Sequence, residues 1–172
     1  MRDTFLPFSP PMLGDDEIDE VIDTLRSDWI TTGPKTRRFE QEFAAKVDAP
    51  DALAVFSCTD AMQVALAALG VGPGDAVFTT TFTFCATAHV AVHLGATPVL
   101  VDVEPDTLNL DPSALRVAIE RTLADGQLRP KVIMPVHYAG HPCDMVAIDA
   151  IAAEFGLHIV EDAAHAFPAA LE

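Results

Sequence analysis

The chain alternates between segments with a helical spacing of apolar residues and short runs that are wholly apolar. An apolar stripe from Ile18 to Leu25 faces a row of acidic residues, which predicts an amphipathic helix over 15–26. A Gly-Pro pair then breaks the pattern, and a second helix is expected over 36–47. These two segments predict an N-terminal helical arm, residues 1–50.

From residue 51 onward, apolar runs and helical stretches alternate in the order typical of βαβ units. The expected strands are 53–56, 76–78, 98–102, 131–136 and 157–160. The expected helices are 59–69, 84–94, 111–123 and 144–155. The strands are continuous apolar runs, as they should be when helices cover both faces of a sheet. The sequence therefore predicts an α/β fold over 51–172, with three α/β/α layers and a mostly parallel sheet.

Charge narrows the range of partners. The 172 residues include 10 Lys and Arg against 26 Asp and Glu, for a formal charge of −16. Such a chain repels phosphate backbones and anionic lipid, so we expect neither nucleic acid nor a membrane as a partner. No apolar run is long enough for a membrane span and no secretion signal begins the chain, so a cytoplasmic protein is expected.

Cysteine and histidine spacing does not predict a metal site. The three cysteines form no CxxC pair, which favours reduced thiols. The pairs His89/His93 and His137/His141 have helical spacing but lack the glutamate of an HExxH motif.

Polar and aromatic residues follow three of the expected strands, at the ends where open α/β sheets bind ligands. The segment 57–61, Ser-Cys-Thr-Asp-Ala, opens a helix and either holds a phosphate on its N–H groups or forms a simple capping box. Phe82 and Phe84 either stack on a flat ring or pack in the core. Asp162 either pairs with a protonated ring nitrogen or caps a helix, with His165 close by. Together the three segments predict a site for pyridoxal 5′-phosphate (PLP).

These motifs, in this order, resemble the DegT/DnrJ/EryC1/StrS family of sugar-nucleotide aminotransferases, which are fold-type I PLP enzymes. The resemblance spans essentially the whole chain and rests on segments 29–34, 57–61, 74–75, 81–84, 95–99, 136–140 and 161–165. Segments 5–9 and 29–35 are most similar to the branch that makes 4-amino-4-deoxy-arabinose on UDP.

The resemblance implies a role for each matching residue. Thr59, Asp60 and Ala61 would bind the cofactor phosphate, and Phe84 would stack on the pyridine ring. Asp162 would pair with the ring nitrogen. His165 would lie near the phenolic oxygen of the PLP ring. The residues that would contact the substrate are Thr31, Thr32 and Gly33. Cys58 stands where relatives commonly have glycine.

The implied activity is transfer of an amino group from glutamate to a nucleotide-linked keto-sugar, by a homodimer in the intact form. In the family, the lysine that bonds to PLP follows the 161–165 motif by some twenty or more residues. Lys35, Lys46 and Lys131 do not match it, so we expect a truncated and inactive form. Two alternatives stay open: a non-catalytic fragment that assembles with a separate C-terminal half, or another fold-type I PLP enzyme.

The family's sheet has seven strands in the order 3-2-4-5-6-7-1. A chain with only the first five strands would leave 53–56 without a neighbour and 157–160 as an exposed edge.

Overall fold

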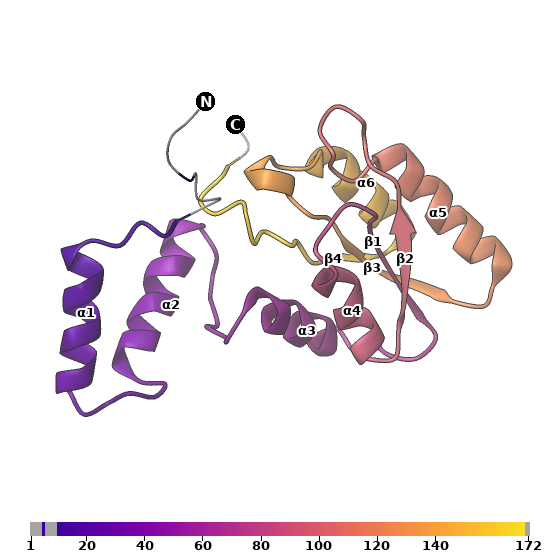
Figure 1. Ribbon diagram of the computed structural model, residues 1–172. Helices are drawn as coiled ribbons and strands as arrows, with labels where there is room; N and C mark the ends of the chain where they lie inside the picture. The colour runs from indigo at the N-terminus through magenta and orange to yellow at the C-terminus, as the bar shows by residue number, and fades with distance from the viewer. Residues whose placement is uncertain (1–4, 6–9, 171–172) are drawn as a thin grey trace. The chain divides into compact units, whose positions relative to one another are not determined.

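The computed structural model describes residue 5 and residues 10–170 (Figure 1). The chain divides into two compact units, Met1–Leu53 and Ala54–Glu172. Most of the 5–9 segment that resembles the arabinose branch lies outside the described residues.

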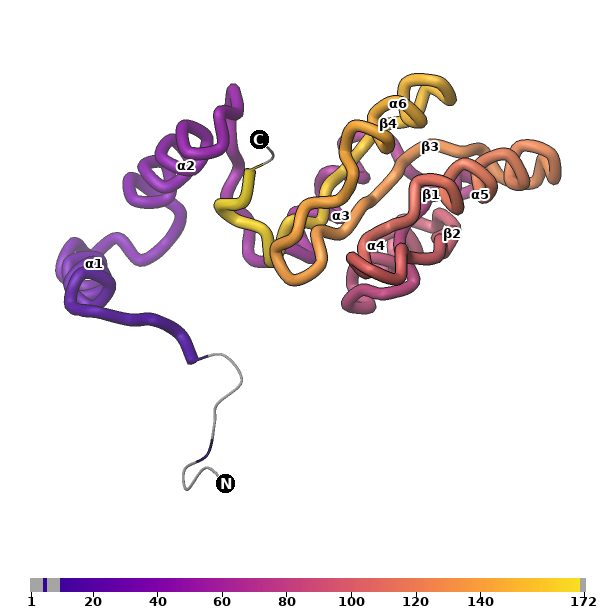
Figure 2. Tube along the Cα trace, turned by 90° about the horizontal axis from the view of Figure 1, so that it is seen from above, coloured from indigo at the N-terminus to yellow at the C-terminus, as the bar shows by residue number. Residues whose placement is uncertain are grey.

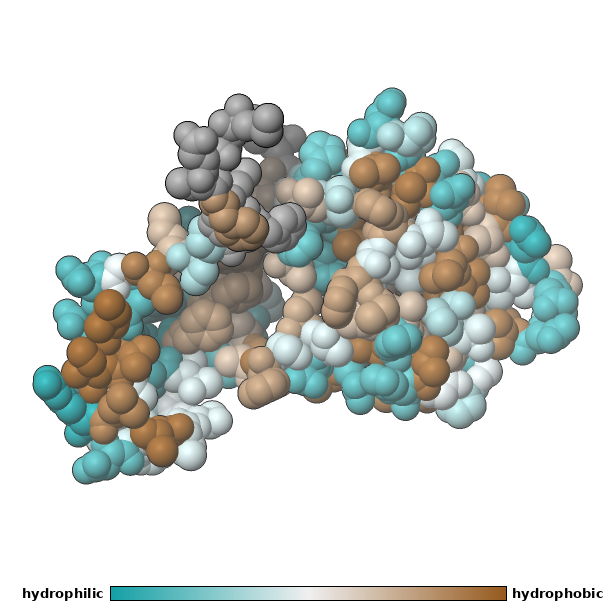
Figure 3. Space-filling model, viewed as in Figure 1, coloured by the Kyte–Doolittle hydropathy of each residue, from teal (hydrophilic) through white to brown (hydrophobic). Residues whose placement is uncertain are grey.

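The first unit contains the two expected helices, α1 (Asp15–Arg26) and α2 (Pro34–Lys46). Ion pairs link them, since Glu20 contacts Lys35 Nζ at 2.5 Å and Arg38 Nη2 at 2.6 Å. The apolar stripe on α1 stays open, with Val21 59% and Leu25 64% exposed. Figure 3 shows this stripe as a band of apolar residues on α1.

The second unit is built around four parallel strands in the order β2-β1-β3-β4. The strands are β1 (Asp75–Thr80), β2 (Thr97–Val101), β3 (Arg129–Met134) and β4 (His158–Ile159). The helices are α3 (Cys58–Ala68), α4 (Ala86–His93), α5 (Pro112–Asp125) and α6 (Met145–Phe155), with a 3₁₀ turn at Tyr138–Gly140. This order confirms the 3-2-4-5 part of the expected sheet.

Alternation along the strands sends neighbouring side chains to opposite faces of the sheet. Val77 and Val132 are paired in register and pack on α3 and α4, whereas Phe78 and Ile133 pack on α5 and α6. All four are fully buried, each contributing about 1.5–3 kcal/mol. Figures 1 and 2 show the two pairs of helices on opposite sides of the strands, which confirms the three layers.

Local signals placed the start of α5 and the end of α6 correctly. The Asp111 carboxylate accepts hydrogen bonds from the N–H groups of Ser113 (2.7 Å) and Ala114 (3.3 Å), which begins α5 as expected for an N-cap. Gly156, with a φ of 67°, ends α6 in the left-handed conformation that glycine adopts without strain.

One expected strand is wrong. Residues 53–56 form no strand, and Leu53 and Phe56 are 71% and 99% exposed. An apolar run becomes a strand only when another strand accepts its backbone hydrogen bonds, and no described strand pairs with this segment. The expected strand over 157–160 is shortened to β4, which pairs with β3.

Candidate cofactor site

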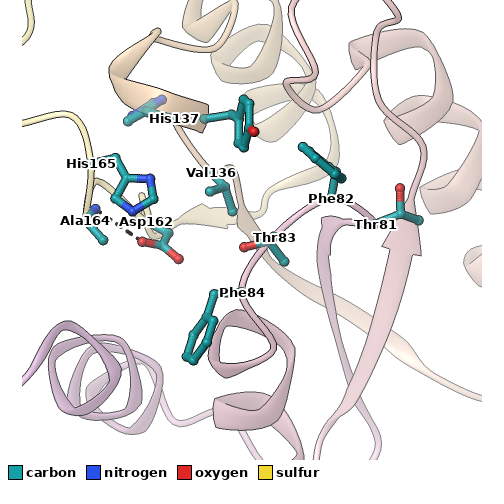
Figure 4. Close-up of a pocket in the computed structure, with 10 residues that line it drawn as sticks. Thr81, Phe82, Thr83, Phe84, Val136, His137, Asp162, Ala164 and His165 are labelled. Carbon is teal, nitrogen blue, oxygen red and sulfur yellow. Dashed lines mark hydrogen bonds between the residues drawn. The ribbon is translucent and has the colours of Figure 1, made fainter. Parts of the chain in front are cut away.

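A cavity of about 370 Å³ opens at the C-terminal ends of β1 and β3, where the chain also emerges from β4 (Figure 4). It is lined by Thr81, Phe82, Thr83, Phe84, Val136, His137, Tyr138, Asp162, Ala164 and His165. These residues come from the segments that follow three parallel strands, and the carboxyl ends of parallel strands meet at one edge of the sheet. The fold therefore brings Phe84, Asp162 and His165 together as the sequence predicted.

Asp162 is the buried acid of this cavity, with only 6% of its surface exposed. Its backbone continues the pairing of β4 with the β3 segment, because Asp162 N–H donates to Pro135 O (2.9 Å). Its Oδ2 accepts a hydrogen bond from Thr87 Oγ1 at 2.8 Å, and its Oδ1 accepts one from Ala164 N–H at 3.3 Å. The carboxylate is thus held in one orientation at the cavity wall.

His137 fixes the strand end that carries Asp162. Its Nδ1 accepts a hydrogen bond from Cys143 N–H at 3.1 Å, so the ring proton lies on Nε2 and is donated to Glu161 at 2.7 Å. This hydrogen bond lowers the pKa of Glu161 below its usual range, although burial opposes the shift. His137 N–H also donates to Asp162 O at 3.2 Å.

Aromatic rings supply flat walls. The rings of Phe82 and Tyr138 lie 4.8 Å apart between centroids. Phe84 is 77% exposed, and Figure 4 shows its ring at the cavity across from Asp162. An aromatic ring that is so exposed does not pack in the core, so the core-packing alternative is excluded for Phe84.

His165 lies beside Asp162 with its imidazole at the cavity (Figure 4). Gly140 permits this approach: it has a φ of 86°, and a Cβ there would lie 3.0 Å from His165 O. Any other residue at position 140 would be strained and would push the His165 segment away.

Thr59, Asp60 and Ala61 lie in the first turn of α3 and do not line the cavity. Ser57 Oγ accepts a hydrogen bond from Asp60 N–H (3.1 Å) and donates to Asp60 Oδ2 (2.9 Å), so Ser57 caps the helix. Among the described residues, Ser57 N–H makes no bond to the Asp60 carboxylate, so only half of the expected capping box forms. Asp60 N–H is therefore occupied. Among the described residues, no acceptor lies on the N–H groups of Cys58 and Thr59, which leaves two donors at a positive helix end.

The other sequence-predicted contacts, Thr31, Thr32 and Gly33, belong to the first unit. Thr32 and Gly33 line a separate cavity there, at the start of α2. Thr32 O accepts a hydrogen bond from Trp29 Nε1 at 3.1 Å.

Lys131, in the second unit, is the third residue of β3 and donates to Asp75 Oδ2 at 3.1 Å and to Gly70 O. It therefore lies at the edge of the sheet opposite the cavity, as expected.

Two contributors were not found from the sequence. Thr87 contacts Asp162 across 75 positions and His137 contacts Glu161 across 24. A signal for Thr87 was present, since Thr83 and Thr87 are four residues apart at the start of a helix and share a 2.8 Å hydrogen bond. Nothing local identified Asp162 as the partner of Thr87 or Glu161 as the partner of His137.

In residue 5 and residues 10–170, no three His, Cys, Asp or Glu side chains are grouped to hold a metal ion. No helix in that part of the chain has both the length and the apolar character to cross a bilayer.

Comparison with known proteins gives a consistent result. Residues 11–172 match the model of the DegT/DnrJ/EryC1/StrS aminotransferase family. The spore coat polysaccharide biosynthesis protein SpsC from Bacillus subtilis is 50% identical over 165 residues, which are 96% of this chain and 41% of SpsC.

Solved structures agree with that match. A family aminotransferase from Brucella abortus is 38% identical with a TM-score of 0.83, covering 85% of this chain and 39% of that one. NtdA from Bacillus subtilis, solved with bound cofactor PMP, is 32% identical with a TM-score of 0.78, covering 88% and 34%.

The chain spans about two fifths of the length of the relatives it matches. Within that span, the strand order, the cavity at the strand ends and the sequence match all agree: this chain belongs to the DegT/DnrJ/EryC1/StrS aminotransferase family.

Proposed function

We propose that the second unit holds PLP as part of a sugar aminotransferase. The observation that carries this proposal is the buried Asp162 carboxylate, fixed at the wall of a cavity that also exposes an aromatic ring. A carboxylate in that place suits a protonated pyridine nitrogen, and the exposed ring of Phe84 suits a flat heterocycle. The donor set therefore fits the cofactor.

The proposed contacts follow from this placement. Asp162 pairs with the ring nitrogen, Phe84 stacks on the ring and His165 lies near the phenolic oxygen. The open N–H groups of Cys58 and Thr59 at the start of α3 receive the phosphate, with Ala61 in the same turn. Asp60 contributes mainly to the helix cap, because its N–H is already bonded to the N-cap residue Ser57.

The cofactor, when bound, supplies an electron sink that lets an amino group pass between two substrates. Asp162 keeps the ring nitrogen protonated, and the His137–Glu161 pair holds Asp162 in place. We propose glutamate as the amino donor and a nucleotide-linked keto-sugar as the acceptor. The name of SpsC, a polysaccharide biosynthesis protein, and the family match support a sugar substrate.

We further propose that the intact form is a cytoplasmic homodimer and that Thr31, Thr32 and Gly33 contact the substrate. None of Lys35, Lys46 and Lys131 is assigned as the residue that bonds to PLP, so these 172 residues by themselves should not sustain turnover. Borohydride reduction of the chain mixed with PLP should label no single lysine. Stoichiometric labelling of one of the three would contradict this assignment.

The cofactor proposal is tested with 4-deoxypyridoxine 5′-phosphate, which has the ring and phosphate of PLP but no aldehyde, so binding does not need a lysine. Equilibrium dialysis should show one saturable site on the purified chain. Asp162→Asn should weaken binding about tenfold or more, because a charge-assisted hydrogen bond is lost. Asp149→Asn, at an exposed position on α6, is the control and should change nothing. Absence of saturable binding, or equal binding by Asp162→Asn, would refute the proposal.

A further inference from the structure

The Asp162 carboxylate in the cavity contacts Cys58, a residue at the start of α3, where we propose that the cofactor phosphate binds. Cys58 Sγ, in the first turn of α3, lies 3.6 Å from Asp162 Oδ1, although the two residues are 104 positions apart. Asp162 Oδ2 is bonded to Thr87, in the first turn of α4. One oxygen of the carboxylate is thus in contact with α3 and the other with α4.

The direction of each hydrogen bond follows from the chemistry of the groups. An ionised carboxylate can only accept, so the Cys58 thiol must donate to it. Partial burial of the sulfur and the nearby charge of Asp162 raise the pKa of the Cys58 thiol, which keeps the thiol proton in place near neutral pH. Thr87 has one hydroxyl proton and directs it to Asp162 at 2.8 Å, so Thr83 Oγ1 donates to Thr87 Oγ1 in turn.

We infer that Cys58 is a positioning residue for Asp162. Its thiol donates to Oδ1 while Thr87 donates to Oδ2, so the carboxylate cannot rotate and stays aimed at the cavity. The backbone N–H of Cys58 lies at the start of α3, where we propose that the phosphate binds. Cys58 therefore connects Asp162 to the proposed phosphate site. A glycine at this position would leave Oδ1 without the thiol. This inference rests on the proposed function for its purpose, but the contact is testable without any cofactor.

The contact is tested by alkylation with iodoacetamide across a range of pH, with peptide mass spectrometry to follow Cys58 and Cys85 separately. Both cysteines are exposed, whereas Cys143 is buried. In Asp162→Asn the rate profile of Cys58 should move to lower pH, and its labelling near neutral pH should rise several-fold, because the adjacent negative charge is gone. Cys85 should keep its profile. An unchanged Cys58 profile would overturn the inference.

Protection of Cys143 from labelling reports that each variant is folded. If Asp162→Asn exposes Cys143, the test uses the wild-type chain alone. The pH midpoint of Cys58 alkylation must then be higher in the folded chain than in urea, and an equal or lower midpoint overturns the inference.

The positioning role is tested with Cys58→Ser, which keeps a donor, and Cys58→Ala, which removes it. Binding of 4-deoxypyridoxine 5′-phosphate should weaken about two- to tenfold in Cys58→Ala and much less in Cys58→Ser. Equal binding by wild type and both variants would overturn the positioning role. No binding by the wild type would refute the proposed function itself, while the alkylation profile would still decide the contact between Cys58 and Asp162.

Discussion

Asp75 is a buried charge whose removal should destabilise this fold. It begins β1 with only 2% of its side chain exposed. Its carboxylate accepts hydrogen bonds from Arg129 Nε (2.8 Å), Lys131 Nζ (3.1 Å) and Gly72 N–H (3.0 Å). It thereby joins the N-terminal ends of β1 and β3 to the turn before β1. The perturbation is Asp75→Asn, which keeps the shape and removes the charge.

The size of the effect follows from how exposed the partners are. Removing one member of a fully buried ion pair costs about 3–5 kcal/mol, because the other charge is left unpaired. Here the side chain of Lys131 is 18% exposed, but that of Arg129 is 72% exposed and regains water. We therefore expect Asp75→Asn to lower the free energy of unfolding by about 2–3 kcal/mol near neutral pH.

The effect should also depend on pH. Burial by itself would raise the pKa of Asp75, but hydrogen bonds from Arg129, Lys131 and Gly72 outweigh it and lower the pKa below its usual range. A lowered pKa in the folded state means that the unfolded chain binds the proton first as the pH falls. The stabilisation is therefore complete above the pKa of an unfolded aspartate, about 3.9, and declines below it.

The assay is urea unfolding followed by far-UV circular dichroism, near neutral pH and at about pH 3.5. The difference between wild type and Asp75→Asn should be largest at neutral pH and smaller in acid. Asp149→Asn, at an exposed site on α6, should change stability by less than about 0.5 kcal/mol at either pH. A loss below about 0.5 kcal/mol for Asp75→Asn, or one that does not shrink in acid, would refute the reasoning.

Two further predictions concern the core and the site. Leu115→Ala on α5 removes a fully buried side chain and should cost about 2–5 kcal/mol in urea unfolding, whereas Val117→Ala, 52% exposed on the same helix, should cost well under 1 kcal/mol; similar losses would contradict the packing described. His137→Phe removes the acceptor of the buried Cys143 N–H, so it should lower the free energy of unfolding by about 1–3 kcal/mol and speed hydrogen exchange at the Cys143 amide. The control His89→Phe, at an exposed position, should leave that exchange slow. Unchanged protection of Cys143 in His137→Phe would show that the hydrogen bond is not formed.

Much of the fold could be predicted from the sequence because its signals are local. The apolar run of β1 and the capping signals of Asp111 and Gly156 act within a few residues, so short segments carry them completely. The position of Phe84 and Asp162 after strands was likewise enough to bring them to one edge of a parallel sheet. The family resemblance then supplied the strand order, which periodicity alone does not contain.

What only the tertiary structure decided depends on contacts between distant segments. The run 53–56 looks like a strand but forms none, because a strand needs a partner for its hydrogen bonds and no local signal reports one. The side-chain donors on the Asp162 carboxylate, Cys58 and Thr87, are 104 and 75 positions away and meet it only when α3 and α4 pack against the sheet. The sequence determined which groups would stand at the strand ends, and side-chain packing determined which of them would bond to one another.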